Sequence, residues 1–351
     1  MASKDIKERL DPSLLSNEGY KYKEIENGIR LNLNESPFPP PSFIIEEVAK
    51  VLSMGNRYPD SKYYQKFKEN AARYVGLEPD NILPTAGSDN AIKAIIYNLV
   101  KPNGKIVINE PSFTMYEIYA KARGISVVKV QLKEGEDSWI QDTEKLLEMS
   151  KEADLVAIDD PNNPTGSPMI GGKREIIEKL ASTVKGFVLI DEAYYEFAGY
   201  TVVGMVKDYP NLLVTRTLSK AFSLAGFRLG YLVGDSKVVK ALNASSGPFE
   251  IPLPSIVAGI TALENPRYAR EVAKTISDNR EFLYNQLKEL GFKVYRSLAN
   301  FLLIKDEKRN LLDFLMNKGI AIKRFYDNYY RISIGTKEQC ELVVNALREL
   351  V

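Results

Sequence analysis

The chain has 351 residues, with 47 Lys and Arg against 46 Asp and Glu, one cysteine and no histidine. Without histidine, Ser-His-Asp and Cys-His nucleophiles and histidine-ligated zinc are excluded, so proton transfer must fall to Lys, Tyr, Asp, Glu or Cys. A net charge of +1 argues against a nucleic-acid partner. The lone Cys340, the charged N-terminus and the lack of a long apolar run predict a cytoplasmic protein without disulfide, metal site or membrane span.

Short apolar segments between residues 82 and 235 alternate with helical patterns. Strands are expected at residues 106–109, 127–130, 155–159, 187–190, 212–215 and 229–233. Ile92, Ile95, Ile96 and Leu99 have helical spacing, which predicts a helix over residues 88–98. Nearly continuous apolar strands separated by helices are typical of a mostly parallel sheet with helices on both faces, so this part is predicted to be an α/β domain.

The pattern changes after the Pro- and Ser-rich stretch 245–255. A long helix is expected at 267–290, then strands at 292–296 and 301–304, a helix at 310–317, strands at 320–323 and 330–334, and a final helix. This series predicts a smaller α+β domain. We therefore expect an N-terminal arm (1–40) packed on the small domain or a partner subunit, a large domain (41–245) and a small C-terminal domain (246–351).

Polar side chains follow three of the predicted strands, where open α/β sheets bind their ligands. Asp191 and Tyr194 follow one strand, Lys220 follows the next along the chain, and Asn163 follows a third. Neither nucleotide-binding glycine motif is present. The helix that opens at Gly87 offers a simpler anion site, although an ordinary helix start would look the same.

Lys220 lies between hydroxyl residues, and Arg228 follows eight residues later. A lysine in this setting is suited to hold a carbonyl cofactor covalently, with the arginine on its phosphate. Taken alone, Lys220 is more typical of a solvated surface lysine. The surrounding motifs decide between the two.

An ordered set of motifs resembles the fold-type-I pyridoxal-phosphate (PLP) enzymes, and most closely the histidinol-phosphate aminotransferases. The matching segments are residues 31–37 (LNLNESP), 57–60 (RYPD), 86–90 (AGSDN), 111–116 (PSFTMY), 162–166 (NNPTG), 191–194 (DEAY), 217–228 (TLSKAFSLAGFR), 299–303 (ANFLL) and 330–336 (YRISIGT). The resemblance implies a large domain with a mostly parallel sheet flanked by helices, a smaller α+β domain, and PLP as the cofactor.

The resemblance also implies roles for individual residues. Lys220 would carry the cofactor and move the proton, and Asp191 would pair with the pyridine nitrogen. Asn163 and Tyr194 would hydrogen-bond the phenolic oxygen, and Phe113 would stack on the ring.

The cofactor's phosphate would lie where a helix begins. The resemblance assigns it to the backbone of Ser88 and Asp89, the hydroxyls of Thr217 and Ser219, and the guanidinium of Arg228. Tyr58 matches a residue that reaches the cofactor of the neighbouring subunit, so a homodimer is expected.

The substrate's anionic end is expected at Arg331. A second cation of the family is an arginine, where this chain has Lys323 followed by Arg324, which leaves open which of the two faces the pocket. Tyr20 or Tyr22 is a further candidate. The implied reaction is amino transfer from histidinol phosphate, a phosphorylated amine, to a 2-oxo acid such as 2-oxoglutarate, in histidine biosynthesis. A threonine-phosphate decarboxylase, an aromatic or general aminotransferase, and a non-catalytic ligand sensor are the alternatives.

Overall fold

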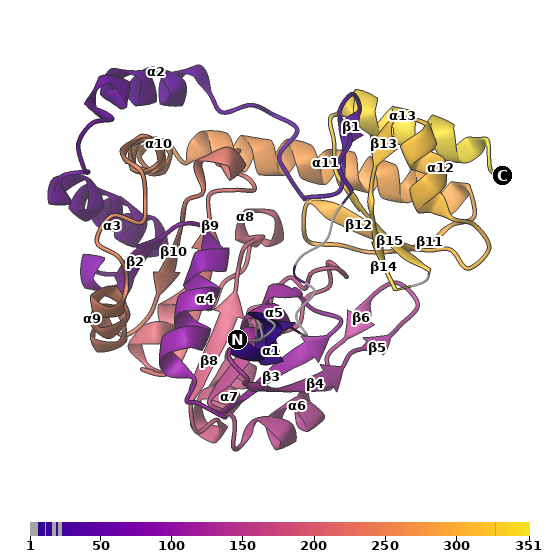
Figure 1. Ribbon diagram of the computed structural model, residues 1–351. Coiled ribbons are helices and arrows are strands. Elements are labelled where there is room, and N and C mark those ends of the chain that lie inside the picture. Colours follow the sequence, from indigo (N-terminus) through magenta and orange to yellow (C-terminus); the bar gives the residue numbers. More distant parts are fainter. Residues whose placement is uncertain (1–5, 11, 16–18, 20–22, 327) are drawn as a thin grey trace, which may run out of the picture.

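A seven-stranded mixed sheet forms the larger body of the molecule (Figure 1). The computed structural model describes residues 6–10, 12–15, 19, 23–326 and 328–351. In spatial order the strands are β2 (Ile82–Thr85), β10 (Gly230–Val233), β9 (Leu212–Thr217), β8 (Phe187–Asp191), β7 (Leu155–Asp159), β3 (Lys105–Glu110) and β4 (Ser126–Gln131). Six of them point in the same direction, and β10 lies antiparallel to its two neighbours, β2 and β9.

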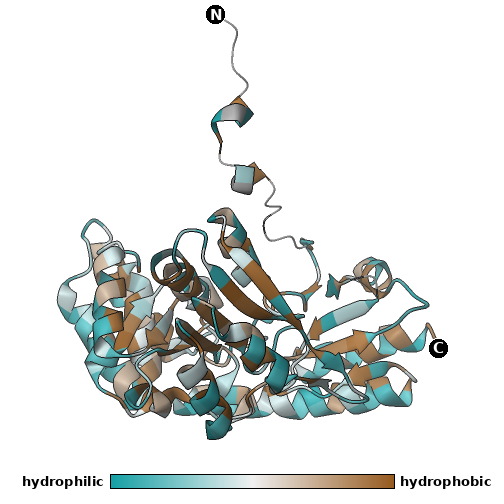
Figure 2. Cartoon of the chain, turned by 90° about the horizontal axis from the view of Figure 1, so that it is seen from below, coloured by the Kyte–Doolittle hydropathy of each residue, from teal (hydrophilic) through white to brown (hydrophobic). Residues whose placement is uncertain are grey.

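Helices cover both faces of this sheet. Buried side chains of α4 (Ser88–Leu99), α5 (Met115–Ala122) and α9 (Ser236–Ser245) pack on one face. The other face lies in the same hydrophobic cluster as α3 (Ser61–Val75), α6 (Thr143–Ser150), α7 (Arg174–Thr183), α8 (Tyr195–Ala198) and α10 (Leu253–Glu264), and α2 (Ser42–Val51) packs on α10. Successive residues of one strand point to opposite faces, as Val156 and Ala157 of β7 do. The apolar strands accordingly lie inside the more hydrophilic helices (Figure 2).

A second, four-stranded antiparallel sheet lies beside the first. Its order is β11 (Lys293–Tyr295), β12 (Phe301–Lys305), β15 (Tyr329–Ser333) and β14 (Lys323–Phe325). The helices of this region are α11 (Arg267–Glu289), α12 (Leu311–Asn317) and α13 (Lys337–Arg348). The long α11 passes from the neighbourhood of α10 to that of α13 and so runs along both parts of the molecule (Figure 1).

Two small sheets complete the described structure. Strand β1 (Ile29–Arg30) pairs in parallel with β13 (Ile320–Ala321), which brings the N-terminal region to the four-stranded sheet. The hairpin β5 (Lys133–Glu134) and β6 (Trp139–Ile140) follows β4 and reaches the same sheet. There Glu134 accepts hydrogen bonds from Tyr295 and Tyr329, at 2.5 and 2.7 Å. Besides these, the described N-terminal residues include the short helix α1 (Pro12–Leu15).

Two sequence expectations are corrected here. The strand expected at 320–323 is two strands, β13 and β14, which pair with different partners. The Pro- and Ser-rich stretch 245–255, for which no helix was predicted, contains the start of α10, whose buried apolar residues pack against α2 and α3. Among the described residues, no helix combines the length and apolarity needed to span a bilayer.

Candidate active site

A cavity of about 150 Å³ lies at the carboxyl ends of β7, β8 and β9. It gathers most of the residues predicted from the sequence, namely Ser88, Asp89, Phe113, Asn163, Asp191, Tyr194, Thr217, Ser219, Lys220, Arg228 and Arg331. The parallel strands explain this convergence, because their carboxyl ends meet at one edge of the sheet.

Lys220 follows β9 and points its amine toward the N-terminal segment. Its Nζ donates a hydrogen bond to the carbonyl oxygen of Leu33 at 3.3 Å. Burial, and next the positive charge of Arg331, lower the pKa of Lys220 from 10.5 to about 8. A much larger share of this lysine is therefore neutral near pH 7 than of an ordinary surface lysine.

Asp191 ends β8 and is held by two hydroxyl groups. Its Oδ1 accepts a hydrogen bond from Thr215 Oγ1 at 2.9 Å, and its Oδ2 accepts one from Tyr116 at 3.4 Å. Burial raises the pKa of Asp191 to about 6, against the effect of these bonds. In a chain without histidine, a threonine and a tyrosine thus hold this carboxylate.

Asn163 and Tyr194 present hydrogen-bond donors to the cavity. Arg331 Nη1 donates to Asn163 Oδ1, and because a guanidinium has only donors, the amide nitrogen of Asn163 is the group left for a ligand. Asn34 Nδ2 donates to the Tyr194 hydroxyl oxygen at 3.0 Å, so the hydroxyl proton of Tyr194 is available. Both side chains are therefore suited to bind an oxygen anion.

One end of the cavity is suited to bind a phosphate. Helix α4 begins there after Gly87, which has a φ of 84°. A Cβ on this glycine would lie 2.9 Å from Arg228 Nη2, so glycine allows the guanidinium to approach the helix start. The buried Ser219 Oγ has no hydrogen-bond partner among the described residues. A helix N-terminus, a guanidinium and an unsatisfied hydroxyl together form an anion site.

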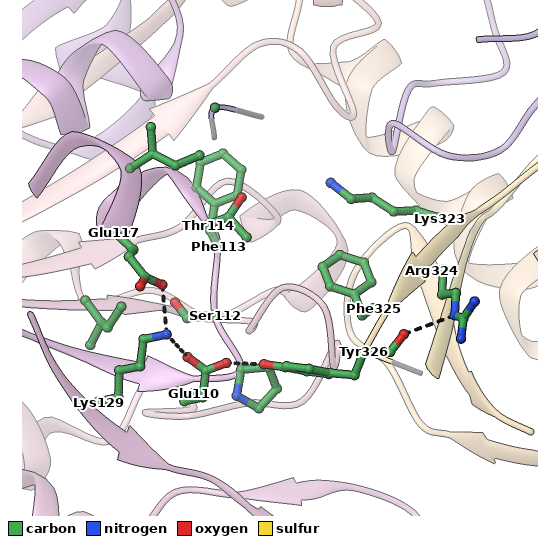
Figure 3. Close-up of a pocket in the computed structure, with 14 residues that line it drawn as sticks. Glu110, Ser112, Phe113, Thr114, Glu117, Lys129, Lys323, Arg324, Phe325 and Tyr326 are labelled. Carbon is green, nitrogen blue, oxygen red and sulfur yellow. Dashed lines mark hydrogen bonds and ion pairs between the residues drawn. The ribbon is translucent and has the colours of Figure 1, made fainter. Parts of the chain in front are cut away.

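An adjoining cavity of about 390 Å³ shares Phe113 with the first (Figure 3). Lys323 extends into it toward Phe113, whereas Arg324 turns aside and donates from Nε to the carbonyl oxygen of Tyr326 at 3.1 Å. Lys323 faces Arg331 across the β14–β15 pair. Burial, and then the charge of Arg331, lower the pKa of Lys323 to about 7. Two basic side chains thus line the adjoining cavities, Arg331 the one that holds Lys220 and Lys323 the other.

Among the described residues of the prediction, Tyr58 lines neither of these two cavities. Tyr58 has 75 % of its surface exposed and stacks on Phe249, with 4.3 Å between the ring centroids. Tyr20, like Tyr22, lies outside the described residues.

The sequence reasoning assigned no role to several residues that the structure brings to this site. They are Asn34, Tyr116, Asp159 and Thr215. The signal for Thr215 was its position, since it pairs with Asp191 in the β8–β9 register. Asn34 and Tyr116 lie within the quoted motifs, but only the fold shows which polar atoms they contact.

Comparison with known proteins places this chain in a known protein family. The family model "Aminotransferase class I and II" matches residues 26–347, and the chain belongs to this family. It is 52 % identical to a histidinol-phosphate aminotransferase of Sulfurisphaera tokodaii, over 99 % of this chain and 97 % of that protein. It is 34 % identical to the enzyme of that name from Thermoanaerobacter pseudethanolicus, over 95 % of each chain.

A solved structure agrees with these matches. The histidinol-phosphate aminotransferase from Sinorhizobium meliloti, in complex with pyridoxal-5'-phosphate, superposes with a TM-score of 0.87 at 25 % identity, over 97 % of each chain. Within its family, the chain therefore belongs with the histidinol-phosphate aminotransferases.

The residues of the cavity fit PLP, the cofactor of these enzymes. The unsatisfied Ser219 hydroxyl and Arg228 suit its phosphate, and the donors of Asn163 and Tyr194 suit its phenolic oxygen. Lys220 supplies an amine of lowered pKa for its aldehyde. Each polar group of the cofactor has a complementary group in this one cavity.

Proposed function

We propose that this protein is a PLP-dependent aminotransferase that converts L-histidinol phosphate and 2-oxoglutarate into imidazole acetol phosphate and L-glutamate. The observation that carries the proposal is the position of Lys220. Its amine, with a pKa lowered to about 8, shares one cavity with Asp191 and with a phosphate-type anion site. The names of the relatives that match over nearly the full chain support the substrate.

The residues around Lys220 have separate roles in the proposed reaction. When bound, the cofactor supplies a carbonyl for covalent attachment and a ring that withdraws electrons from the substrate. Asp191, fixed by Thr215 and Tyr116, keeps a proton on the ring nitrogen. Asn163 and Tyr194 donate hydrogen bonds to the phenolic oxygen.

Proton transfer falls to Lys220. In its neutral form, its Nζ would accept the proton from the substrate's Cα. The protonated amine would then give this proton to the C4′ carbon of the cofactor. The lowered pKa serves this step, because a general base works best when its pKa is near the working pH.

The substrate's anionic end is assigned to two cations. Arg331 is 3 % exposed and is fixed through Asn163 and through the carbonyl oxygen of Asn32, at 2.8 Å from Nη2. Lys323 adds a second charge at the same end. Binding of a phosphate monoester there would favour the protonated form of Lys323.

The test compares three amino-group donors and identifies the residue to which the cofactor is attached. Histidinol phosphate, phenylalanine and threonine phosphate are each offered with 2-oxoglutarate, and glutamate formation is measured. We expect turnover of histidinol phosphate, and its absence would refute the proposed substrate. Borohydride reduction of the holoenzyme should fix the cofactor to Lys220, and Lys220→Ala should abolish transfer. Lys318→Ala, at an exposed pair with Glu349, serves as the control.

We further propose that the protein acts as a homodimer in the cytoplasm, with Tyr58 reaching the partner's cofactor phosphate. The high exposure of Tyr58 and of the ring it stacks on supports this assignment. Mixing inactive Lys220→Ala protein with Tyr58→Ala protein should restore activity, because one site of the mixed dimer carries neither defect. A monomer in light scattering, or no gain on mixing, would contradict the assignment.

A further inference from the structure

Asp159 is a buried carboxyl in the cofactor cavity to which the proposed reaction gives no role. It is the last residue of β7, is 2 % exposed, and pairs in register with Asp191 of β8. Both side chains line the same cavity. A second buried acid so close to the first requires an explanation, because burying a charge without partners is costly.

Three hydrogen bonds to Asp159 come from two different loops. Its Oδ2 accepts from the backbone N–H of Asn163 at 2.6 Å. Its Oδ1 accepts from Ser112 Oγ at 3.0 Å and from Asn162 Nδ2 at 3.1 Å. The two N–H groups can only donate, so the arrangement matches an ionised carboxylate. Ser112 directly precedes Phe113, so the carboxylate joins the loop of Phe113 to that of Asn163.

The electrostatic setting of Asp159 differs from that of an ordinary structural acid. Burial raises the pKa of Asp159, the hydrogen bond from Asn163 opposes this rise, and the charge of Asp191 adds to it, so that the pKa reaches about 7. Neighbouring Asp160 is equally buried and also accepts three hydrogen bonds, from the backbone of Met169 and Gly171 and from the Tyr200 hydroxyl. Asp160 is not among the residues that line the cavity.

We propose that Asp159 is a positioning residue, whose carboxylate fixes Asn163 and Phe113 relative to one another around the cofactor. The inference rests on the proposed function, in which these two residues contact PLP. Asn163 lies at the amide that Asp159 binds most closely, so loss of this bond displaces the donor of the phenolic oxygen. This displacement can be measured as a shift in the pH midpoint of the cofactor's absorption change in the holoenzyme.

The direction of the midpoint shift separates positioning from simple charge. A donor on the phenolic oxygen stabilises the deprotonated form of the Lys220-bound cofactor and lowers the midpoint, so a displaced Asn163 raises it. Removal of a nearby negative charge acts in the opposite direction, because an anion favours the protonated form. A defect confined to folding shifts the midpoint in neither direction.

The experiment compares Asp159→Asn with the matched control Asp160→Asn by pH titration of holoenzyme absorbance. Asparagine keeps the shape of Asp159 but offers one acceptor where two are used. Asp159→Asn also removes a negative charge, which acts in the opposite direction, but a displaced donor on the phenolic oxygen has the larger effect. We expect a net rise of the midpoint, of about half a unit to one unit at most, the equivalent of one hydrogen bond. Asp160→Asn should lower thermal stability and leave the midpoint unchanged. An unchanged or lowered midpoint in Asp159→Asn would overturn the proposal.

A milder variant covers the case in which Asp159→Asn does not fold. Ser112→Ala removes one contact at a partly exposed position and should weaken PLP binding about three- to tenfold in equilibrium dialysis. Unchanged PLP binding would overturn the proposal. The wild-type enzyme provides the separate check, because failure of PLP to attach at Lys220 refutes the proposed function itself.

Discussion

Replacing Lys220 with methionine should stabilise the cofactor-free protein, and more so at pH 7 than at pH 10. The pKa of Lys220 is about 8 in the folded chain against 10.5 ordinarily, through burial first and the charge of Arg331 next. Between these values the unfolded chain binds a proton that the folded chain has lost. Raising the pH through this window therefore stabilises wild type, and methionine removes that dependence.

The magnitude follows from the two pKa values. The difference, 10.5 minus 8, corresponds to about 3 kcal/mol at about 1.4 kcal/mol per tenfold change in proton binding. Lys220 is only partly buried and faces the cavity, so screening by water reduces the expected effect to about 2 kcal/mol.

The assay is urea unfolding of both proteins after removal of PLP, at pH 7 and pH 10. The stability advantage of Lys220→Met should fall by about 1 kcal/mol between the two, because the lysine of the unfolded chain is still mostly protonated at pH 10. Lys318→Met, at an exposed ion pair, should show no such change. Parallel pH dependences for wild type and Lys220→Met would refute the reasoning that burial and Arg331 depress this pKa.

Three further substitutions test the surroundings of the site. Thr215→Val removes the 2.9 Å bond to Asp191 and should lower kcat/KM about tenfold in steady-state assays; an unchanged value would mean that the bond does not act on the cofactor. Arg331→Met should raise KM for histidinol phosphate about 100-fold, and an equal KM would exclude it as the anion contact. Glu192→Gln breaks a buried pair, in which Oε2 lies 2.6 Å from Arg216 Nη2, and should cost about 3–5 kcal/mol in urea unfolding.

Six of the seven strands of the large sheet were predicted because their signal is local, and β2 was missed. Strand β7 has the predicted bounds, and β8 extends the prediction by one residue. The antiparallel insertion of β10 was not predicted, since pairing between distant segments leaves no mark in a single apolar run. Helix α10 was missed because it begins within a Pro-rich stretch and is apolar on nearly all sides.

In the candidate site, too, local features were predicted and contacts between distant segments were not. Its cavity residues were predicted from motifs that resemble one family, several of them at strand ends, and a sequence carries such motifs directly. The contacts that hold them depend on register, as for Thr215 beside Asp191, or on packing between the sheets, as for Arg331 on Asn163. The choice of Lys323 over Arg324 likewise required the β14–β15 pairing and the direction of each side chain.

The contact of Glu134 with the four-stranded sheet has a consequence for local unfolding. Although burial raises its pKa, hydrogen bonds from Lys293, Tyr295, Tyr329 and Lys305 lower the pKa of Glu134 to about 2. Trp139 of the same hairpin packs against Tyr295 and Tyr329, at 5.8 and 5.6 Å between ring centroids. We expect the amide hydrogens of this hairpin to exchange with solvent at the rate of β11 and β15. The hairpin follows β4 in the chain, but it should not exchange at the rate of the seven-stranded sheet. The cooperative unit that carries Arg331 would then include a hairpin that follows strand β4 of the large sheet.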